Sequence, residues 1–227
     1  MTHTVGFEAG GKHLTLVFGS EEDHIARTIR RTGTFYEAEL LADVRSRLFF
    51  AECAVDVGAH VGNHALYFAH VLGIRTIAFE PNPTTYGYLV ANLGSNGLGE
   101  TCRTHNAAVG AASGQVRALD ASDRNSGMAT VEADPAGAIA MVTLDDEVLG
   151  EPRIDVIKID VEGWELEVLR GAERVLRQHR PILYIEIMQP RFREVESHLR
   201  EQGYLCWKRF NHTPTFLFLP RERLGAA

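Results

Sequence analysis

Residues 54–63 of the chain read Ala-Val-Asp-Val-Gly-Ala-His-Val-Gly-Asn, and the rest of the chain is organised around them. The first four residues are typical of a short buried strand, and the segment from Gly58 to Gly62 is typical of a turn into a helix. In an open α/β sheet, ligands bind at the carboxyl ends of the strands, where such turns lie. Gly58 tolerates a positive φ and leaves room for a ligand, and the free N–H groups of a helix beginning at Gly62 favour an anionic group.

A carboxylate accompanies each of the first two predicted core strands. Asp56 stands where a dinucleotide-binding G-x-G-x-x-G motif would have its first glycine, and it suits a cationic or N–H-rich ligand group such as the amino acid end of S-adenosylmethionine. Glu80 ends the apolar run 77–79, about 20 residues after the glycine turn, where a carboxylate accepts hydrogen bonds from ribose hydroxyls. Because NAD and S-adenosylmethionine both contain ribose, Glu80 alone does not indicate which of the two cofactors binds.

The chain resembles the FkbM-type methyltransferases in several motifs that recur in order across about residues 33–190. They are Phe35-Tyr36-Glu37, Val55-Asp56-Val57-Gly58-Ala59, Gly62-Asn63-His64, Phe79-Glu80-Pro81-Asn82 and Ile157-Lys158-Ile159-Asp160-Val161-Glu162-Gly163. The resemblance implies a class I methyltransferase fold, which is α/β and Rossmann-like. Its seven-stranded, mostly parallel sheet has helices on both faces and ends in a C-terminal antiparallel β-hairpin. It also implies S-adenosyl-L-methionine as cofactor and O-methylation of small molecules, often sugars or natural-product intermediates.

The strand ends and the resemblance together predict the residues of the cofactor site. They are Phe35, Tyr36, Glu37, Asp56, Gly58, Ala59, Gly62, Asn63, Glu80, Pro81, Asn82, Asn106, Ala107, Ala108 and Asp160. Asn106 to Ala108 come from the third predicted strand, 103–109, and are expected beside the adenine ring, although Asn106 closing a turn is the alternative. Phe35 and Tyr36 either border the ligand or pack the amphipathic helix predicted over 35–49 onto the sheet.

Methyl transfer to a hydroxyl needs an aligned acceptor and a group that removes its proton, and four residues are the catalytic candidates. They are Asp160, Glu186, Lys158 and Glu162. Lys158 and Asp160 project to one face of the strand predicted over 154–161, because side chains alternate along a strand. If the strand over 182–187 is its neighbour, Asp160 and Glu186 converge beside the transferred methyl group. The pair would then act as a base or bind a divalent cation, and a structural ion pair with Lys158 is the alternative.

No metal site is predicted from the remaining candidate ligands. His60 and His64 lie one helical turn apart, but no third ligand follows from the spacing.

Residues 120–137 form a long, polar, Gly-containing loop, and such loops are often functional. We expect it to order over the acceptor, with Asn125, Ser126 and Met128 in contact with it; a mobile surface loop is the alternative. Trp164 is expected in the core, on the helix that follows the 154–161 strand.

The composition is that of an ordinary soluble protein, with 227 residues, 45% hydrophobic and 23% charged. It predicts a single domain over 1–227, with a strand and helix cap over 1–50 and a Rossmann-like core over 51–227. The net charge of −7 disfavours a nucleic-acid partner. Neither a signal peptide nor an apolar stretch long enough for a bilayer is evident, so we expect a cytoplasmic protein without a membrane partner. The oligomeric state is open, a homodimer included.

Three functions remain in competition on these residues. The first is an S-adenosylmethionine-dependent O-methyltransferase with a small-molecule hydroxyl acceptor. The second is an NAD-dependent oxidoreductase, which the glycine spacing and the lack of a recognisable Tyr-x-x-x-Lys motif disfavour. The third is a relative that binds the cofactor without transferring the methyl group.

Overall fold

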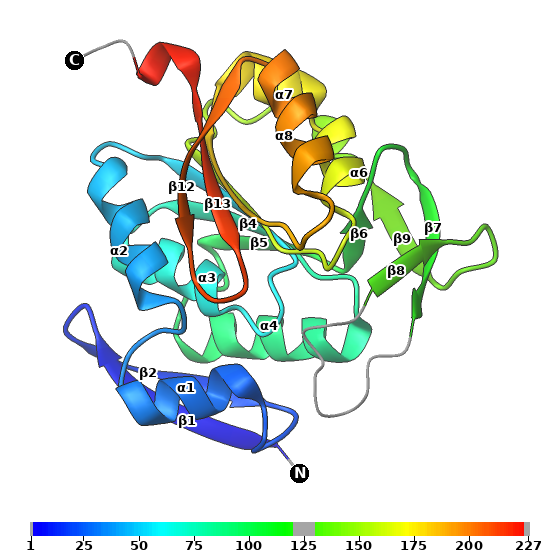
Figure 1. Cartoon of the computed structure of the whole chain (residues 1–227). Coiled ribbons are helices and arrows are strands. Elements are labelled where there is room, and N and C mark those ends of the chain that lie inside the picture. The colour runs from blue at the N-terminus through cyan, green and yellow to red at the C-terminus, as the bar shows by residue number, and fades with distance from the viewer. Residues whose placement is uncertain (1, 120–129, 225–227) are drawn as a thin grey trace.

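The computed structural model describes residues 2–119 and 130–224, and its centre is a seven-stranded sheet (Figure 1). The strand order is β12-β13-β11-β10-β3-β4-β5. The bounds are β3 Cys53–Val57, β4 Arg75–Phe79, β5 Cys102–His105, β10 Val156–Ile159, β11 Ile182–Glu186, β12 Tyr204–Phe210 and β13 Thr215–Pro220. Strands β11, β10, β3, β4 and β5 run parallel, whereas β12 and β13 form an antiparallel hairpin at one edge. This is the predicted class I methyltransferase sheet.

Helices cover both faces of the sheet because the core strands are apolar on both sides. Ala54 and Val156 belong to one buried cluster, whereas their neighbours Val55 and Ile157 belong to the other. The first cluster takes in α2 Ala38–Arg47, α3 Asn63–Leu66, the π-helical turn η1 Tyr67–Val71 and α4 Pro83–Ser95. The second takes in α5 Leu144–Glu147, α6 Glu165–Arg170, α7 Glu173–His179 and α8 Phe192–Glu201. A 3₁₀ turn, η3 Arg221–Arg223, follows β13.

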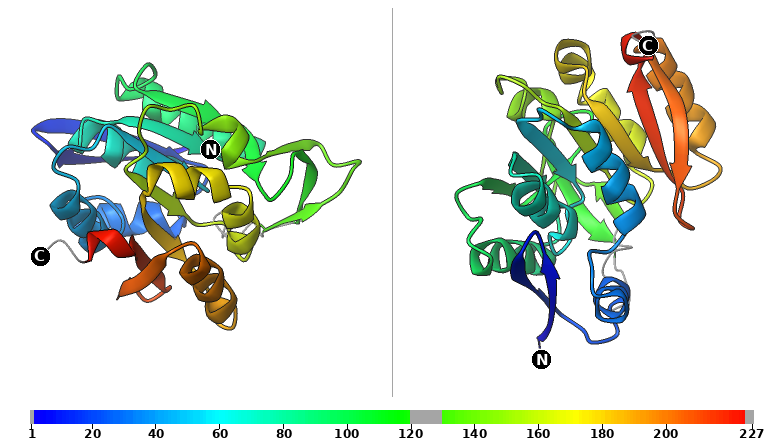
Figure 2. Two further views of the ribbon diagram at one scale, coloured as in Figure 1. Left: turned by 90° about the horizontal axis from the view of Figure 1, so that it is seen from above. Right: turned by 90° about the vertical axis from the view of Figure 1, so that its left-hand side faces the viewer.

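The N-terminal segment forms a hairpin and a helix at one end of the molecule (Figure 2, right). The weak alternation of residues 1–19 predicts a short strand or an edge hairpin, and the structure has a hairpin of β1 His3–Ala9 and β2 Lys12–Phe18. It is fastened to α4 because Asn92 exchanges hydrogen bonds with the backbone of Val17. The helix α1 His24–Thr32 was not predicted, although Asp23 caps its first N–H groups in the usual way.

A second, four-stranded sheet stands beside the main one (Figure 1, right). Its order is β6-β9-β7-β8, with bounds β6 Ala107–Val109, β7 Gly114–Leu119, β8 Thr130–Ala133 and β9 Ile139–Val142. The single strand predicted over 103–109 is therefore wrong, because the chain leaves the main sheet at Asn106. The side chain of Asn106 donates to the carbonyls of Glu80 and Pro81 and holds this change of direction. The predicted loop 120–137 likewise ends early, at β8.

Three smaller expectations about the helices are corrected. The helix predicted over 35–49 begins only at Ala38, because Glu37 takes a left-handed φ of 58°. The helix expected after β10 is divided into α6 and α7 at Gly171, where a Cβ would lie 2.0 Å from the Gly110 carbonyl oxygen. The apolar residues of the helix predicted between Pro83 and Gly94 are expected to face inward, but one of them, Val90, is 45% exposed on α4. Within residues 2–119 and 130–224, no helix has the length and apolar character needed to cross a bilayer.

Candidate functional site

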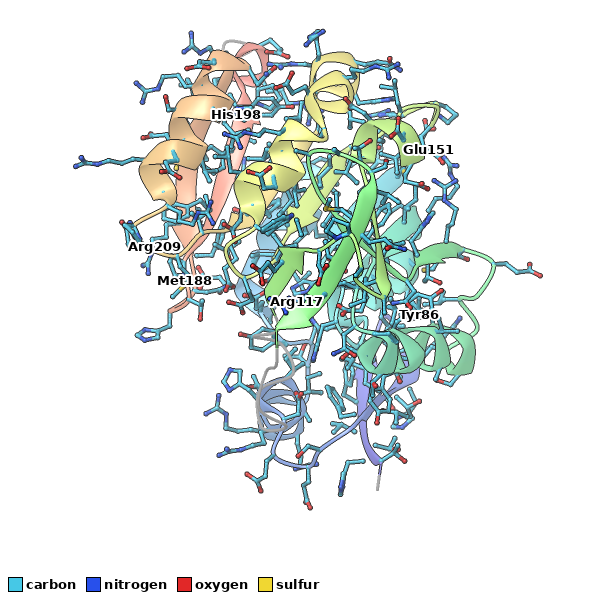
Figure 3. The ribbon with its side chains drawn as sticks, turned by 90° about the vertical axis from the view of Figure 1, so that its right-hand side faces the viewer. Tyr86, Arg117, Glu151, Met188, His198 and Arg209 are labelled. Atoms are coloured by element: carbon cyan, nitrogen blue, oxygen red, sulfur yellow. The ribbon has the colours of Figure 1, made fainter. Side chains whose placement is uncertain are left out.

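A cavity of about 460 Å³ lies beyond the carboxyl ends of β3, β4, β10 and β11, where ligands of open α/β sheets bind. Its wall combines these strand ends with α1, the second sheet and the β12–β13 turn. It is lined by Asp23, His24, Ile25, Tyr36, Val57, Gly58, His60, Phe79, Glu80, Pro81, Ala107, Ala108, Val109, Asp160, Val161, Glu162, Trp164, Glu186, Met188 and Thr213. Figure 3 marks Met188, which follows the end of β11.

One side of the cavity has the chemistry of a nucleoside site. Glu80 follows β4, and its carboxylate is already oriented, because Oε2 accepts from the His60 N–H and Oε1 from the Asn82 N–H, both at 2.9 Å. Burial raises the pKa of Glu80 to about 7. Beside it lie small or flat apolar residues, among them Pro81 and Ala107. These groups fit a nucleoside. The apolar wall suits the base, and the Glu80 carboxylate has lone pairs left to accept hydrogen bonds from ribose hydroxyls.

The glycine turn is shaped by the protein's own backbone. Gly58 has a φ of 79°, and a Cβ there would lie 1.8 Å from the carbonyl oxygen of Asp160. The Asp160 N–H in turn donates to the Val57 carbonyl at 2.9 Å. Gly58 is thus required by the contact between the ends of β3 and β10, and not only by ligand space as expected. Gly62, with a φ of 94°, keeps clear of Leu89 on α4, whose Cδ1 would lie 2.8 Å from an added Cβ.

Three carboxylates meet on the other side of the cavity. One oxygen each of Asp160, Glu162 and Glu186 lies within 4.8 Å of the others. The structure therefore brings Asp160 and Glu186 together, as the predicted neighbouring strands require. Glu162, also a predicted catalytic candidate, reaches the cluster from a left-handed backbone conformation with a φ of 49°. Three carboxylate oxygens could remove a proton or could hold a hard divalent cation.

Electrostatics separate the roles of these three groups. Burial opposes ionisation of Asp160, but Lys158, whose Nζ lies 2.9 Å from Asp160 Oδ2, holds the pKa of Asp160 below its usual range. Burial and the charge of Asp160 raise the pKa of Glu186 to about 8 and that of Glu162 to about 7. Asp160 is thus a fixed anion, whereas Glu162 and Glu186 are positioned to exchange protons near neutral pH.

Half of the predicted site residues that the structure describes lie on the cavity wall. These are Tyr36, Gly58, Glu80, Pro81, Ala107, Ala108, Asp160, Glu162 and Glu186. The described residues that were predicted but do not line it are Phe35, Glu37, Asp56, Ala59, Gly62, Asn63, Asn82, Asn106 and Lys158. Asn125, Ser126 and Met128 lie outside the described residues.

The predicted residues that stand back from the cavity support its wall. Phe35 packs edge-on against Phe7 of β1 and Tyr67 of η1. Asn82 accepts hydrogen bonds from the first N–H groups of α4. Asp56 is fully buried and stands opposite Lys158 in the register of β3 and β10.

Sequence reasoning missed residues that reach the cavity from elsewhere in the chain. Asp23 and His24 come from the start of α1, and Thr213 comes from the turn between β12 and β13. The signal for α1 was available, since Asp23 precedes an apolar pattern at helical spacing, but its contact with the cavity is set by tertiary packing. Trp164, assigned to the core, packs on the second cluster and also lines the cavity.

A family model described as the methyltransferase FkbM domain matches residues 56–206, which include the glycine turn, Glu80 and all three clustered carboxylates. The chain belongs to the FkbM methyltransferase family. Among curated proteins it is similar to the hexuronic acid methyltransferase AglP of Haloferax volcanii, with 32% identity over 124 residues. That alignment covers 54% of this chain and 50% of AglP, so the chain spans about half the length of its curated relative.

Solved structures share the fold. The FkbM methyltransferase from Methylobacillus flagellatus matches with a TM-score of 0.55 and 20% identity, over 74% of this chain and 43% of that one. The 16S rRNA N2 G1207 methyltransferase RsmC of T. thermophilus, solved with AdoMet and guanosine, has a TM-score of 0.53 and 15% identity. The match covers 97% of this chain and 50% of the RsmC chain. The cofactor of this FkbM protein is S-adenosyl-L-methionine, and the NAD-dependent alternative is set aside.

Proposed function

We propose that this FkbM protein transfers the methyl group of S-adenosylmethionine to a hydroxyl oxygen of a small molecule. The observation that carries the proposal is the meeting of Asp160, Glu162 and Glu186 on the cavity wall, across from the nucleoside side formed around Glu80. A carboxylate beside the reacting centre is what an alcohol acceptor needs, because its proton must leave as the new bond forms.

The proposed roles follow from the geometry. The nucleoside of the cofactor lies along Pro81, Ala107 and Ala108, with its ribose hydroxyls on Glu80. The acceptor hydroxyl lies against Glu186, which takes its proton while the oxygen bonds to the methyl carbon. The carbon–sulfur bond breaks with its electron pair going to sulfur, so the cationic sulfonium becomes a neutral thioether. Lys158 keeps Asp160 ionised, and the carboxylates stabilise the sulfonium until transfer.

A sugar is the acceptor class we favour. The matched relative AglP is described as a hexuronic acid methyltransferase. A cavity of about 460 Å³ that must also hold the cofactor leaves room for a small acceptor, and the net charge of −7 does not favour a nucleic acid. The acceptor-side carboxylates and Tyr36 offer hydrogen-bonding groups for neighbouring hydroxyls.

The test is product formation from methyl-labelled cofactor with a panel of hexuronides, neutral hexosides and amino sugars. Mass spectrometry detects the product, and NMR of the product identifies the methylated atom. Asp160→Asn and Glu186→Gln keep shape while removing charge, and each should lose about 10²-fold or more of turnover while still binding cofactor. Glu100→Gln, at an exposed position, is the matched control.

Each contrary result has a distinct meaning. Cofactor binding without product from any acceptor would favour the binding-only relative. Methylation of an amino sugar nitrogen would replace O-methylation by N-methylation. Full turnover in Glu186→Gln would remove that residue as the base. Excess EDTA tests the cation: loss of turnover restored by Mg²⁺ would mean that the three carboxylates bind a metal ion.

A further inference from the structure

Glu37 was predicted to bind the cofactor, but its side chain points into the protein and joins three distant segments. The side chain is 4% exposed, and its Oε2 lies 2.8 Å from Nε2 of His64, whose side chain is 7% exposed. Its Oε1 accepts a hydrogen bond from Nδ2 of Asn211. Glu37 precedes α2, His64 is in α3, and Asn211 is in the turn between β12 and β13. One carboxylate thus connects the N-terminal part, the helix after the glycine turn and the C-terminal hairpin.

The two ends of the Glu37–Asn211 contact share an unusual backbone conformation. Glu37 has a φ of 58° and Asn211 a φ of 61°, in the left-handed region that residues other than glycine seldom adopt. Such residues persist where the surrounding structure holds them, and they gather at functional sites. In Figure 1 the turn of the hairpin comes down beside the start of α2, and the hydrogen bond from Asn211 to Glu37 joins these two segments.

The residues on either side of this contact form the cavity wall. Tyr36 precedes Glu37, and Thr213 lies two positions after Asn211; both line the cavity. Tyr36 is fixed through its backbone, because its N–H donates to Asn63 Oδ1 at 3.0 Å and its carbonyl accepts from Asn63 Nδ2 at 3.2 Å. Asn63 and the adjacent His64 therefore hold Tyr36 and the adjacent Glu37 as a unit.

These neighbours stand on the acceptor side of the cavity. Burial raises the pKa of the Tyr36 phenol, and the nearby charges of Glu37, Glu186 and Asp160 add to the rise. Thr213 precedes the strand that pairs with β11, whose last residue is Glu186 and whose register places Glu186 opposite Thr215. The Glu80 side of the cavity is formed by other elements, β4 and β6.

We propose that Glu37 is a positioning residue for the acceptor: by binding His64 and Asn211 it sets Tyr36 and Thr213 side by side, so that they form one wall against which the acceptor aligns. The inference rests on the proposed transfer reaction. It assigns Glu37 to acceptor alignment through Tyr36 and Thr213, and not to contact with the cofactor.

The experiment compares Glu37→Ala, Asn211→Ala and the double variant with wild type. In Glu37→Ala we expect the acceptor KM to rise about 10-fold and kcat to fall, since small misplacements of a reacting group are costly, while the cofactor Kd stays within about twofold. The double variant should be no worse than Glu37→Ala, because the two residues act through one contact. Glu37→Gln, which can still accept from Asn211, should recover most of the acceptor affinity.

Two exposed neighbours serve as matched controls. Glu39→Ala removes a carboxylate from the first turn of α2, and His212→Ala removes a side chain from the same hairpin turn. Both should leave the acceptor KM unchanged. A cofactor Kd raised as much as the acceptor KM, or additive losses in the double variant, would overturn the proposal.

A second readout does not need turnover. Hydrogen exchange at the amides of residues 211–215 should speed up in Glu37→Ala and stay at the wild-type rate in Glu39→Ala. If the wild type transfers no methyl group to any acceptor, the proposed function fails, and this measurement still tests the contact. Unchanged exchange in a folded Glu37→Ala protein would show that Glu37 does not position the turn.

Discussion

Nζ of Lys158 lies 2.9 Å from Oδ2 of Asp160, and the two side chains differ in burial: that of Lys158 is 3% exposed and that of Asp160 is 29% exposed. The ammonium is therefore enclosed within the sheet, and only the carboxylate reaches the cavity. Asp56 faces the same ammonium from the neighbouring strand. Burial nevertheless raises the pKa of Asp56, so Asp160 is the carboxylate that Lys158 keeps ionised.

Replacing Lys158 by methionine should lower the free energy of unfolding by about 3–5 kcal/mol at pH 7, because removing one partner of a buried pair leaves the other charge uncompensated. Asp160 has a folded-state pKa below its unfolded value near 3.9, so this contribution is present above about pH 4 and is lost as the pH falls below it. Urea denaturation at pH 7 and pH 3 measures the difference. An equal loss at both pH values would contradict the ion-pair explanation.

The core strands and the Glu80 side of the site could be predicted because local sequence determines them. Residues 53–57 and 75–79 are buried except for Arg75, and Gly58 and Glu80 follow them at the ligand edge of the sheet. The adjacency of Asp160 and Glu186 followed from the usual strand order alone. These features depend on a few consecutive residues and on one topological rule.

The acceptor side could not be predicted in the same way. Asp23 and Thr213 come from opposite ends of the chain, and only the packing of α1 and the C-terminal hairpin brings them to the cavity. Glu162 was a catalytic candidate, but its meeting with the other two carboxylates depends on a left-handed backbone that its residue type does not indicate. Glu37 was placed on the ligand because it belongs to the Phe35-Tyr36-Glu37 motif, and nothing local reveals that its side chain turns inward.

Gly58→Ala should destabilise the protein by about 2–5 kcal/mol, the sum of a left-handed alanine and a steric conflict with the Asp160 carbonyl. Gly97→Ala is the matched control, since Gly97 has a similar φ of 73° and an added Cβ there meets nothing within 4 Å. It should cost only about 1–2 kcal/mol. Denaturant unfolding of both variants measures the difference. Equal losses of unfolding free energy would show that the backbone at Asp160 accommodates the added Cβ without a cost in stability.

Glu80→Ala should weaken cofactor binding by about 1.5–3 kcal/mol, the range for losing hydrogen bonds to a charged group. Part of this effect is indirect, because the Glu80 carboxylate also holds the N–H groups of His60 and Asn82 in place. Titration calorimetry with S-adenosylmethionine measures the change, with Glu100→Ala as an exposed control. Unchanged affinity in Glu80→Ala would remove Glu80 from the cofactor site.

The pH dependence of turnover tests Glu186 as the base. A base must be ionised to accept a proton, and burial with the neighbouring Asp160 raises the pKa of Glu186 to about 8. The rate should therefore rise with pH. When the acceptor is varied at a cofactor concentration below saturation, kcat/KM reports the ionisation of the free enzyme, and it should level off near pH 8. The profile of kcat should level off at a lower pH, because the bound sulfonium favours the ionised carboxylate.

Glu186→Gln should remove this rising limb and lower kcat by about 10²-fold or more. Glu162→Gln is the informative comparison, because Glu162 also has a raised pKa, of about 7, in the same cluster. It should retain a rising limb, moved to lower pH because one acidic neighbour of Glu186 has lost its charge. If Glu162→Gln loses the limb and Glu186→Gln keeps it, the base is Glu162 and the acceptor hydroxyl lies on the α6 side of the cluster.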